Sequence, residues 1–188
     1  SVNRQRVAVI LGSIALPTES SAALAQTWLR ENHSPESLLN LSPASVPAHI
    51  LSTALGLGGS RFTLDAACAS SLYALKLACD DLRESRADLV LAGGVCRPDI
   101  FYTQIGFTAL DALSKGGVCH SLDARADGLM VGEGAGIFAL KRLSDAEAHG
   151  DQILALIRGV GLSNDRDGGL MAPSSEGQLR AMHSAYQS

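Results

Sequence analysis

The chain has 188 residues, 46% of them hydrophobic and 18% charged, which is typical of one globular domain and excludes a disordered segment. A formal net charge of −4, with no Lys- or Arg-rich stretch, argues against nucleic-acid binding. No apolar run approaches the roughly 20 residues that a membrane span needs. Frequent glycine and scarce aromatic residues suit close-packed α/β layers.

The first predicted elements alternate between strand and helix. Residues 7–11 form a continuous apolar run that ends at Gly12, as expected of a strand buried on both faces. Apolar positions over residues 20–30 predict a helix, and the Ser-, Pro- and Asn-rich residues 31–46 predict a loop. Residues 47–55 predict a short helix that glycines terminate.

The middle of the chain repeats this alternation. Residues 62–64 predict a strand that enters a tight turn at residues 65–68. Apolar residues at three- and four-residue spacings predict a helix over residues 70–84. Residues 88–92 predict another strand, closed by Gly93 and Gly94.

The last third predicts two more strands and a helix. After a long connection over residues 96–127, residues 137–140 and 153–157 predict neighbouring buried strands. Residues 176–186 predict a further helix. No internal repeat is present, so the sequence predicts one layered α/β unit.

The four cysteines show neither a CxxC pair nor a histidine at metal-ligand spacing. Free thiols in a reducing cytoplasm are the simplest interpretation, which favours at least one cysteine with a reactive role. The cysteines are Cys68, Cys79, Cys96 and Cys119.

Cys68 stands where a predicted strand turns into a predicted helix. Unpaired N–H groups and the positive end of the helix dipole would stabilise a thiolate there, and the oxyanion formed when it attacks a thioester. The small residues around it leave room for a substrate: Ala66, Ala67, Ala69, Ser70 and Ser71. A small buried hydrophobe is the alternative for Cys68. For Cys79, inside an apolar stripe, a core role is preferred.

The stretch Asp-Ala-Ala-Cys-Ala-Ser-Ser-Leu at residues 65–72 closely resembles the active-site motif of β-ketoacyl synthases. The resemblance continues in the family's order almost to the end of the chain, through residues 87–95, 106–114, 121–128, 132–136, 140–143 and 157–173. Its Asp-Ala-Ala-Cys-Ala-Ser-Ser form is most similar to synthase domains of iterative polyketide and polyunsaturated fatty acid synthases. The resemblance identifies Cys68 as the nucleophile.

The resemblance implies a thiolase-like α/β fold, of which the chain forms mostly the N-terminal half, a layered unit around a buried nucleophile helix. Residues 1–188 would be the central part of a synthase domain whose start is absent. None of the five histidines lies in the motifs that carry the family's two catalytic histidines, so we expect these beyond Ser188. The chain alone is then expected to be inactive.

The implied activity is that of a 3-oxoacyl-[acyl-carrier-protein] synthase, an acyltransferase of fatty acid or polyketide biosynthesis. Cys68 would take an acyl group from the phosphopantetheine of an acyl carrier protein. A decarboxylating malonyl-carrier would then attack the acyl-cysteine. The family implies a cytoplasmic homodimer, with no cofactor or metal held by this segment.

By the same resemblance, Phe107 and Leu129 line the acyl pocket, with a plain core role as the alternative for each. Asp123, Arg125 and Asp127 are expected to hold a turn, and Glu133 to be a buried structural carboxylate. The glycines around Glu133 precede a strand, which argues against a nucleotide-binding loop.

Two other functions compete with the synthase. A non-catalytic carrier-docking or dimerisation module would not need Cys68, which is present. Another thiolase-fold enzyme, acting on coenzyme A thioesters, is disfavoured by the long resemblance to β-ketoacyl synthases.

Overall fold

The structure is a computed structural model that describes residues 2–14, 46–97, 100–166 and 173–187, and residues 19, 20, 23, 26, 27 and 31. Most of the helix predicted over residues 20–30 and of the loop predicted over residues 31–46 therefore lies outside the described residues.

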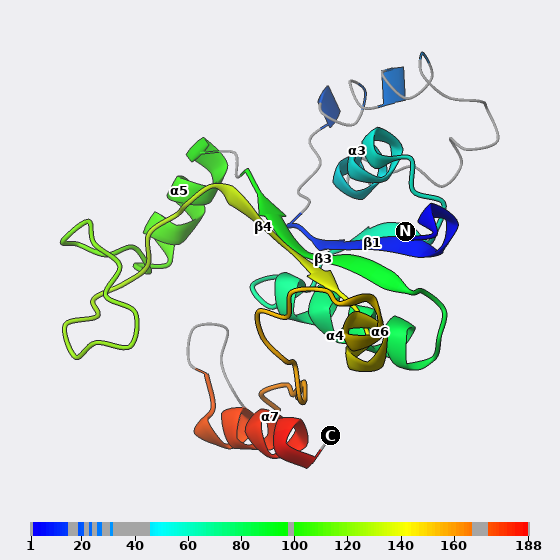
Figure 1. Ribbon diagram of the computed structural model, residues 1–188. Helices are drawn as coiled ribbons and strands as arrows, with labels where there is room; N and C mark the ends of the chain where they lie inside the picture. The colour runs from blue at the N-terminus through cyan, green and yellow to red at the C-terminus, as the bar shows by residue number, and fades with distance from the viewer. Residues whose placement is uncertain are drawn as a thin grey trace.

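A mixed sheet of strand order β2-β1-β3-β4 forms the centre of the described chain (Figure 1). Its strands are β1 (Val7–Gly12), β2 (Arg61–Leu64), β3 (Leu89–Cys96) and β4 (Gly134–Leu140). The first three run parallel, and β4 runs antiparallel to β3. Four of the five predicted strands are thereby confirmed.

Strand β3 is longer than predicted. It continues through Gly93 and Gly94, which pair with Ile137 and Gly136 of β4. A Cβ at Gly93 would collide with the carbonyl oxygen of Gly136. The two glycines thus let β4 approach β3, whereas local sequence rules predict a strand end there.

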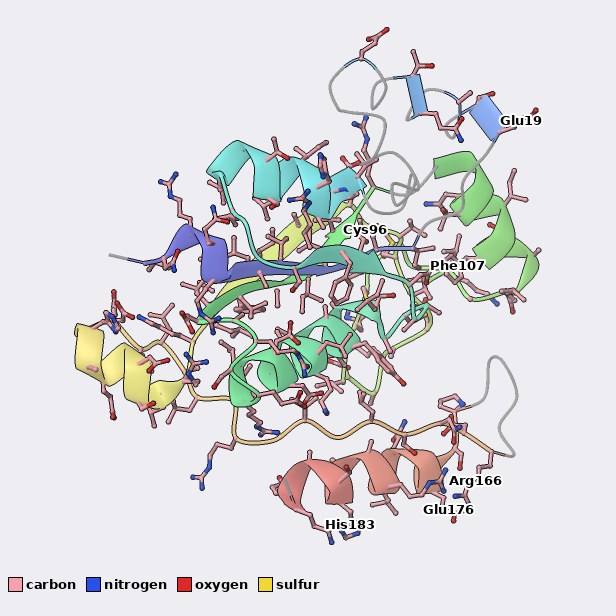
Figure 2. The ribbon with its side chains drawn as sticks, turned by 90° about the vertical axis from the view of Figure 1, so that its right-hand side faces the viewer. Glu19, Cys96, Phe107, Arg166, Glu176 and His183 are labelled. Atoms are coloured by element: carbon pink, nitrogen blue, oxygen red, sulfur yellow. The ribbon has the colours of Figure 1, made fainter. Side chains whose placement is uncertain are left out.

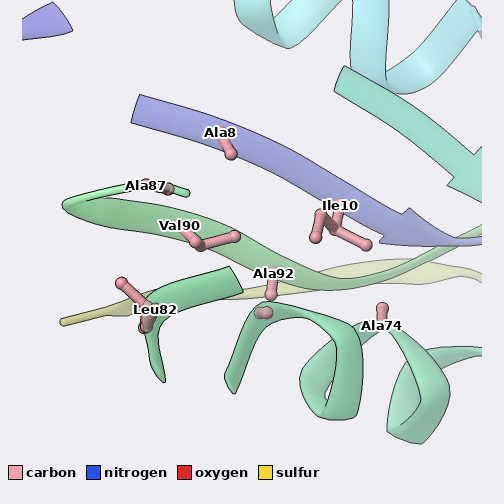
Figure 3. Packing of buried hydrophobic residues seen from close by; sticks show 8 residues of the cluster. Ala8, Ile10, Ala74, Leu82, Ala87, Val90 and Ala92 are labelled. Carbon is pink, nitrogen blue, oxygen red and sulfur yellow. The ribbon is translucent and has the colours of Figure 1, made fainter. Parts of the chain in front are cut away.

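One helix covers each face of the parallel strands. Ala8 and Ile10 of β1 pack with α4 (Ser70–Arg83), whereas Val9 and Leu11 pack with α3 (Val46–Leu55) on the opposite face. This alternation follows from the two-residue period of a strand. Ala74 and Ala78 are wholly buried, so α4 lies close against Ala92 and Val90 of β3 (Figure 3).

Beyond residue 97, the described helices lie outside this sandwich. The predicted helix near the C-terminus is confirmed as α7 (Ser175–Gln187). The long connection predicted over residues 96–127 contains α5 (Ile100–Ala109), and the short α6 (Leu143–His149) was not predicted either. Figure 1 shows α5 and the loop after it extending away from the sheet. Among the described residues, no helix is long and apolar enough to cross a membrane.

The prediction of a strand over residues 153–157 is wrong. This segment has no regular secondary structure, and Leu154 is 88% exposed. An apolar run becomes a buried strand only where a neighbouring strand and a covering layer exist, and the described chain offers it neither. β4 is a strand as predicted, but it is not buried, since Phe138 is 60% exposed.

A cluster of charges joins the N-terminal ends of β1 and β3 to the end of α4. Asp88 accepts hydrogen bonds from Arg6 Nε at 2.7 Å and from Arg142 Nη2 at 3.0 Å. Arg142 also donates to the carbonyl oxygens of Leu82 at 3.0 Å and Ala87 at 2.7 Å. The hydrogen bonds from Arg6 and Arg142 lower the pKa of Asp88 to about 2.

The lowered pKa predicts how Asp88 contributes to stability as the pH changes. Its contribution is fully present above the unfolded-state pKa of about 3.9 and is lost as the pH falls through the folded-state value. We expect Asp88→Asn to lower the urea midpoint most above pH 4, with a difference from wild type that narrows toward pH 2. Asp111→Asn is the control variant: it removes one negative charge from an exposed loop and so shows the effect of net charge alone on the urea midpoint. A difference that stays constant with pH would contradict the role of the Asp88 charge.

Candidate active site

The predicted turn between strand and helix is confirmed, and it is tightly wound. Ala67, the residue before Cys68, has a left-handed backbone with φ of 51°. Its N–H donates to Asp65 Oδ1 at 2.9 Å. The N–H of Ala69 donates to the Ala66 carbonyl at 3.2 Å, so the chain reverses within four residues. Few residues other than glycine adopt this conformation, which marks the turn as strained.

Cys68 is exposed at this turn, two residues before the first residue of α4. Of the first N–H groups of the helix, Ser70 donates to Ala67 O and Tyr73 to Ala69 O. Those of Ser71 and Leu72 have no acceptor within the described part of the chain. The exposed thiol therefore belongs to the turn that leads into the first turn of α4, where free N–H groups form the positive end of the helix dipole.

The helix can begin here because glycines lie beneath it, at the end of β1 and near the end of β3. A Cβ at Gly12 would collide with the backbone of Ser70 and Ser71, and one at Gly94 would lie 3.1 Å from Ser71 Cβ. Ser70 is only 6% exposed. Ser70 is therefore packed against the strands and does not contribute to the open space for substrate that the sequence predicted around Cys68.

The site lies at the carboxyl edge of the parallel strands. Gly12, at the end of β1, pairs with Leu64 at the end of β2 and with Gly94 near the end of β3. The Cys68 turn follows β2 directly, and α5 follows β3, so both leave the sheet at this edge. Figure 2 shows Phe107 of α5 and Cys96 of β3 at the same end of the molecule. Ligands of open α/β sheets bind at such an edge.

Backbone hydrogen bonds connect the two residues predicted to line an acyl pocket. The N–H of Ala112 donates to Phe107 O at 3.0 Å, and that of Leu129 donates to Ala112 O at 2.9 Å. Leu129 also forms an isolated bridge with Leu113. Phe107 and Leu129 are each partly buried. The structure thus joins the end of α5 to the segment that carries Leu129, and we call this hydrogen-bonded unit the loop assembly. Contact of Phe107 and Leu129 with a substrate stays a prediction.

The acidic residues beyond α5 hold the loop, as predicted. Asp127 accepts hydrogen bonds from Ser114 Oγ at 2.6 Å, Gly116 N at 3.0 Å and Lys115 N at 3.1 Å, and these bonds lower its pKa. Gly128 has φ of 151°, and a Cβ there would collide with the backbone of residues 113 and 114.

An ion pair lies in the same loop, where Arg125 Nη2 is 3.0 Å from Asp123 Oδ2. Glu133 is exposed, so the prediction of a buried carboxylate is wrong. The segment around it reaches solvent because nothing in the described chain covers β4.

The remaining thiols and the described histidines differ from Cys68 in their surroundings. Cys79 is partly buried, whereas its predicted core role implies full burial. This partial burial raises the pKa of the Cys79 thiol. His49 is buried on α3, across the sheet from α4. Figure 2 shows His183 on α7, which lies beyond α4 on the side away from the sheet. His33 lies outside the described residues.

Metal binding has no support in the described residues, since no three His, Cys, Asp or Glu side chains come together there. Gly132 precedes β4, and Gly134 and Gly136 lie within it, so these glycines do not lead into a helix as those of a dinucleotide-binding loop do.

Comparison with known proteins agrees with this geometry. Residues 1–146 match the family described as β-ketoacyl synthase, N-terminal domain. The chain is 42% identical over 169 residues to a subunit of the phenolphthiocerol/phthiocerol polyketide synthase of Mycobacterium tuberculosis, covering 81% of this chain and 11% of that protein. It is 44% identical over 146 residues to another subunit of that synthase, covering 76% of this chain and 8% of that protein. The chain thus spans about a tenth of the length of these relatives.

Solved structures show the same fold. The ketosynthase from module 6 of the bacillaene synthase of Bacillus subtilis 168 superposes with a TM-score of 0.77 at 29% identity, covering 99% of this chain and 31% of that one. The ketosynthase–chain length factor PfaC superposes with a TM-score of 0.80 at 36% identity, covering 98% and 22%. The fold is therefore the thiolase-like fold of condensing enzymes. The chain belongs to the β-ketoacyl synthase family.

The contact between β1 and α4 predicts a consequence for Gly12→Ala. The added methyl group has to displace the helix backbone at Ser70, and overpacking of this kind costs about 1–3 kcal/mol. We expect a lower urea midpoint and slower alkylation of Cys68. Gly134→Ala is the matched control, because a Cβ there meets no atom within 4 Å. Equal midpoints for the two variants would show that the approach of α4 does not depend on Gly12.

Proposed function

We propose that this chain provides the acyl-accepting nucleophile of a β-ketoacyl synthase, and that the nucleophile is Cys68. The observation that carries the proposal is an exposed thiol on a left-handed turn at the start of α4. Membership of the β-ketoacyl synthase family supports it, as does the ketosynthase named in each of the two superposed structures.

The reaction has two stages. In the first, the Cys68 thiolate attacks the carbonyl carbon of an acyl thioester, and the carrier thiolate leaves, so that the acyl group becomes bound to sulfur. In the second, a malonyl thioester loses carbon dioxide, and the resulting carbanion attacks the acyl-Cys68 carbonyl. The C–S bond breaks, the Cys68 thiolate is regenerated, and the product is a β-ketoacyl thioester.

The local structure supports the first stage. The free N–H groups of Ser71 and Leu72 belong to the first turn of α4, where such donors stabilise the negative charge that develops on a substrate carbonyl oxygen. Of the other thiols, Cys96 and Cys119 are exposed but lie at no helix N-terminus, and Cys79 is partly buried. Position therefore distinguishes Cys68 more clearly than exposure does.

The second stage requires acid–base groups in addition to Cys68. Acid–base groups must lie within hydrogen-bond reach of the reacting atoms. We assign them to the part of the ketosynthase fold that the chain does not span, since it covers 31% of a solved ketosynthase.

The substrates and partners are proposed from the relatives. We propose acyl carrier proteins as the thioester donors, polyketide-type acyl chains as substrates, and a homodimer as the assembly. The two similar proteins of Mycobacterium tuberculosis are polyketide synthase subunits, which supports this choice of substrate class. The free state of all four thiols supports a reducing, cytoplasmic location.

Phe107 and Leu129 are proposed to line the acyl pocket. The loop assembly that holds them leaves the sheet at the same edge as the Cys68 turn. Each side chain is partly buried, so each keeps surface available for an acyl chain.

If Cys68 is the nucleophile, it is the thiol that an acyl-carrier thioester or a cerulenin-type inhibitor modifies in the intact synthase. We expect the adduct on the peptide that contains Cys68, mapped by mass spectrometry after digestion, and none in Cys68→Ala. Cys96 and Cys119 serve as exposed internal controls. A label on either of them, or on Cys79, with Cys68 unmodified would refute the assignment.

A pocket role for Phe107 predicts that Phe107→Ala changes the chain-length preference or the rate of acyl transfer while largely preserving the fold. A core role instead predicts a loss of stability, about 3–5 kcal/mol for a fully buried phenylalanine. Melting temperature and acyl transfer with short and long acyl-carriers separate the two. Phe138→Ala, on β4, is the matched control. A collapsed melting temperature with unchanged selectivity would exclude the pocket role.

A further inference from the structure

Ser70 is a buried polar residue whose hydroxyl group is committed to the turn that carries Cys68. Its side chain Oγ donates to the carbonyl oxygen of Ala67 at 2.6 Å and accepts the N–H of Ala66 at 2.9 Å. The residue is 6% exposed, so water does not compete effectively for these bonds. A hydroxyl is suited to this position because it donates and accepts at once.

The conformation that these bonds hold is strained. Ala67 has φ of 51°, although its Cβ disfavours the left-handed region. Ser70 Oγ binds the N–H of Ala66 and the carbonyl of Ala67, and Asp65 Oδ1 accepts the N–H of Ala67 at 2.9 Å. The backbone before Cys68 is thus held on one side by Ser70 of α4 and on the other by Asp65, the residue that follows β2.

Ser70 also contacts both the sheet and the turn that carries Cys68. Its backbone lies against Gly12 of β1, close enough that a Cβ on Gly12 would collide with it. The sheet therefore fixes Ser70, and Ser70 fixes the peptide groups of Ala66 and Ala67. The next residue along the chain is Cys68.

We propose that Ser70 is a positioning residue, which holds the Ala66–Ala67 backbone so that the Cys68 sulfur is presented at the start of α4. This inference rests on the proposed role of Cys68 as nucleophile. Ser70 itself touches no reacting atom. Its effect is on the orientation of the thiol, and therefore on the rate of acyl transfer and not on the binding of the carrier.

The test is Ser70→Ala in the intact synthase. Alanine removes both hydrogen bonds, and we expect kcat for acyl transfer to Cys68 to fall about tenfold, the equivalent of one net hydrogen bond. KM for the acyl-carrier should change little. Ser70→Thr, which keeps the hydroxyl group, should restore most of the rate.

Ser52→Ala is the matched control. Ser52 is also buried, and its hydroxyl group donates to the carbonyl oxygen of Leu57 at 3.1 Å, on the opposite face of the sheet. A purely structural role for Ser70 predicts that both variants lower the melting temperature and that neither lowers kcat. A tenfold loss of kcat in Ser70→Ala alone supports positioning. Unchanged kcat in folded Ser70→Ala overturns it.

A second comparison applies if Ser70→Ala does not fold. Ala67→Gly accommodates the left-handed conformation without strain, so the double variant with Ser70→Ala should regain stability. Positioning predicts a lower kcat in the double variant than in Ala67→Gly alone, whereas equal values overturn it. Different results would show that the proposed function itself, the role of Cys68 as nucleophile, is wrong. The wild-type adduct would then form away from Cys68, or Cys68→Ala would remain active.

Discussion

The close approach of α4 to the sheet is the constraint on which the site depends. Ala74 and Ala78 bring the helix onto β1 and β3, and Gly12 and Gly94 allow its first turn to rest on the ends of the same strands. A larger side chain at any of these positions would lift the helix. Because Cys68 stands two residues before the helix, its position is set by the packing of the sheet and not by the loop alone.

The sequence predicted the parts of the fold whose signal is local. The apolar run of β1 and the helical spacing in α4 each carry their own periodicity, and the structure agrees. It failed where the outcome depends on neighbours. Local sequence rules predict that a strand ends at Gly93 and Gly94. In the structure the strand continues, and the two glycines allow β4 to pair with β3. The apolar residues 153–157 lack any strand to pair with in the described chain.

The site was predicted in the same uneven way. The turn at Cys68 followed from a strand that meets a helix through small residues, whereas the role of Cys68 as nucleophile stays a prediction from the family motif. The part played by Ser70 could not be predicted, because a serine in a run of small residues gives no sign of the direction of its hydroxyl group. The nearest signal was its place in the first helical turn, where side-chain oxygens often bond to nearby backbone groups.

The alanine at position 67 connects these observations. A left-handed backbone costs about 1–2 kcal/mol for a residue with a Cβ, and glycine would avoid the cost. Glycine would also make the turn more flexible, since it loses more conformational freedom on folding. With alanine the turn is stiffer, and the bonds from Asp65 and Ser70 offset the strain. Strain that the surrounding structure overdetermines in this way is characteristic of sites where one side chain must be held in place. The side chain that follows Ala67 is the thiol of Cys68.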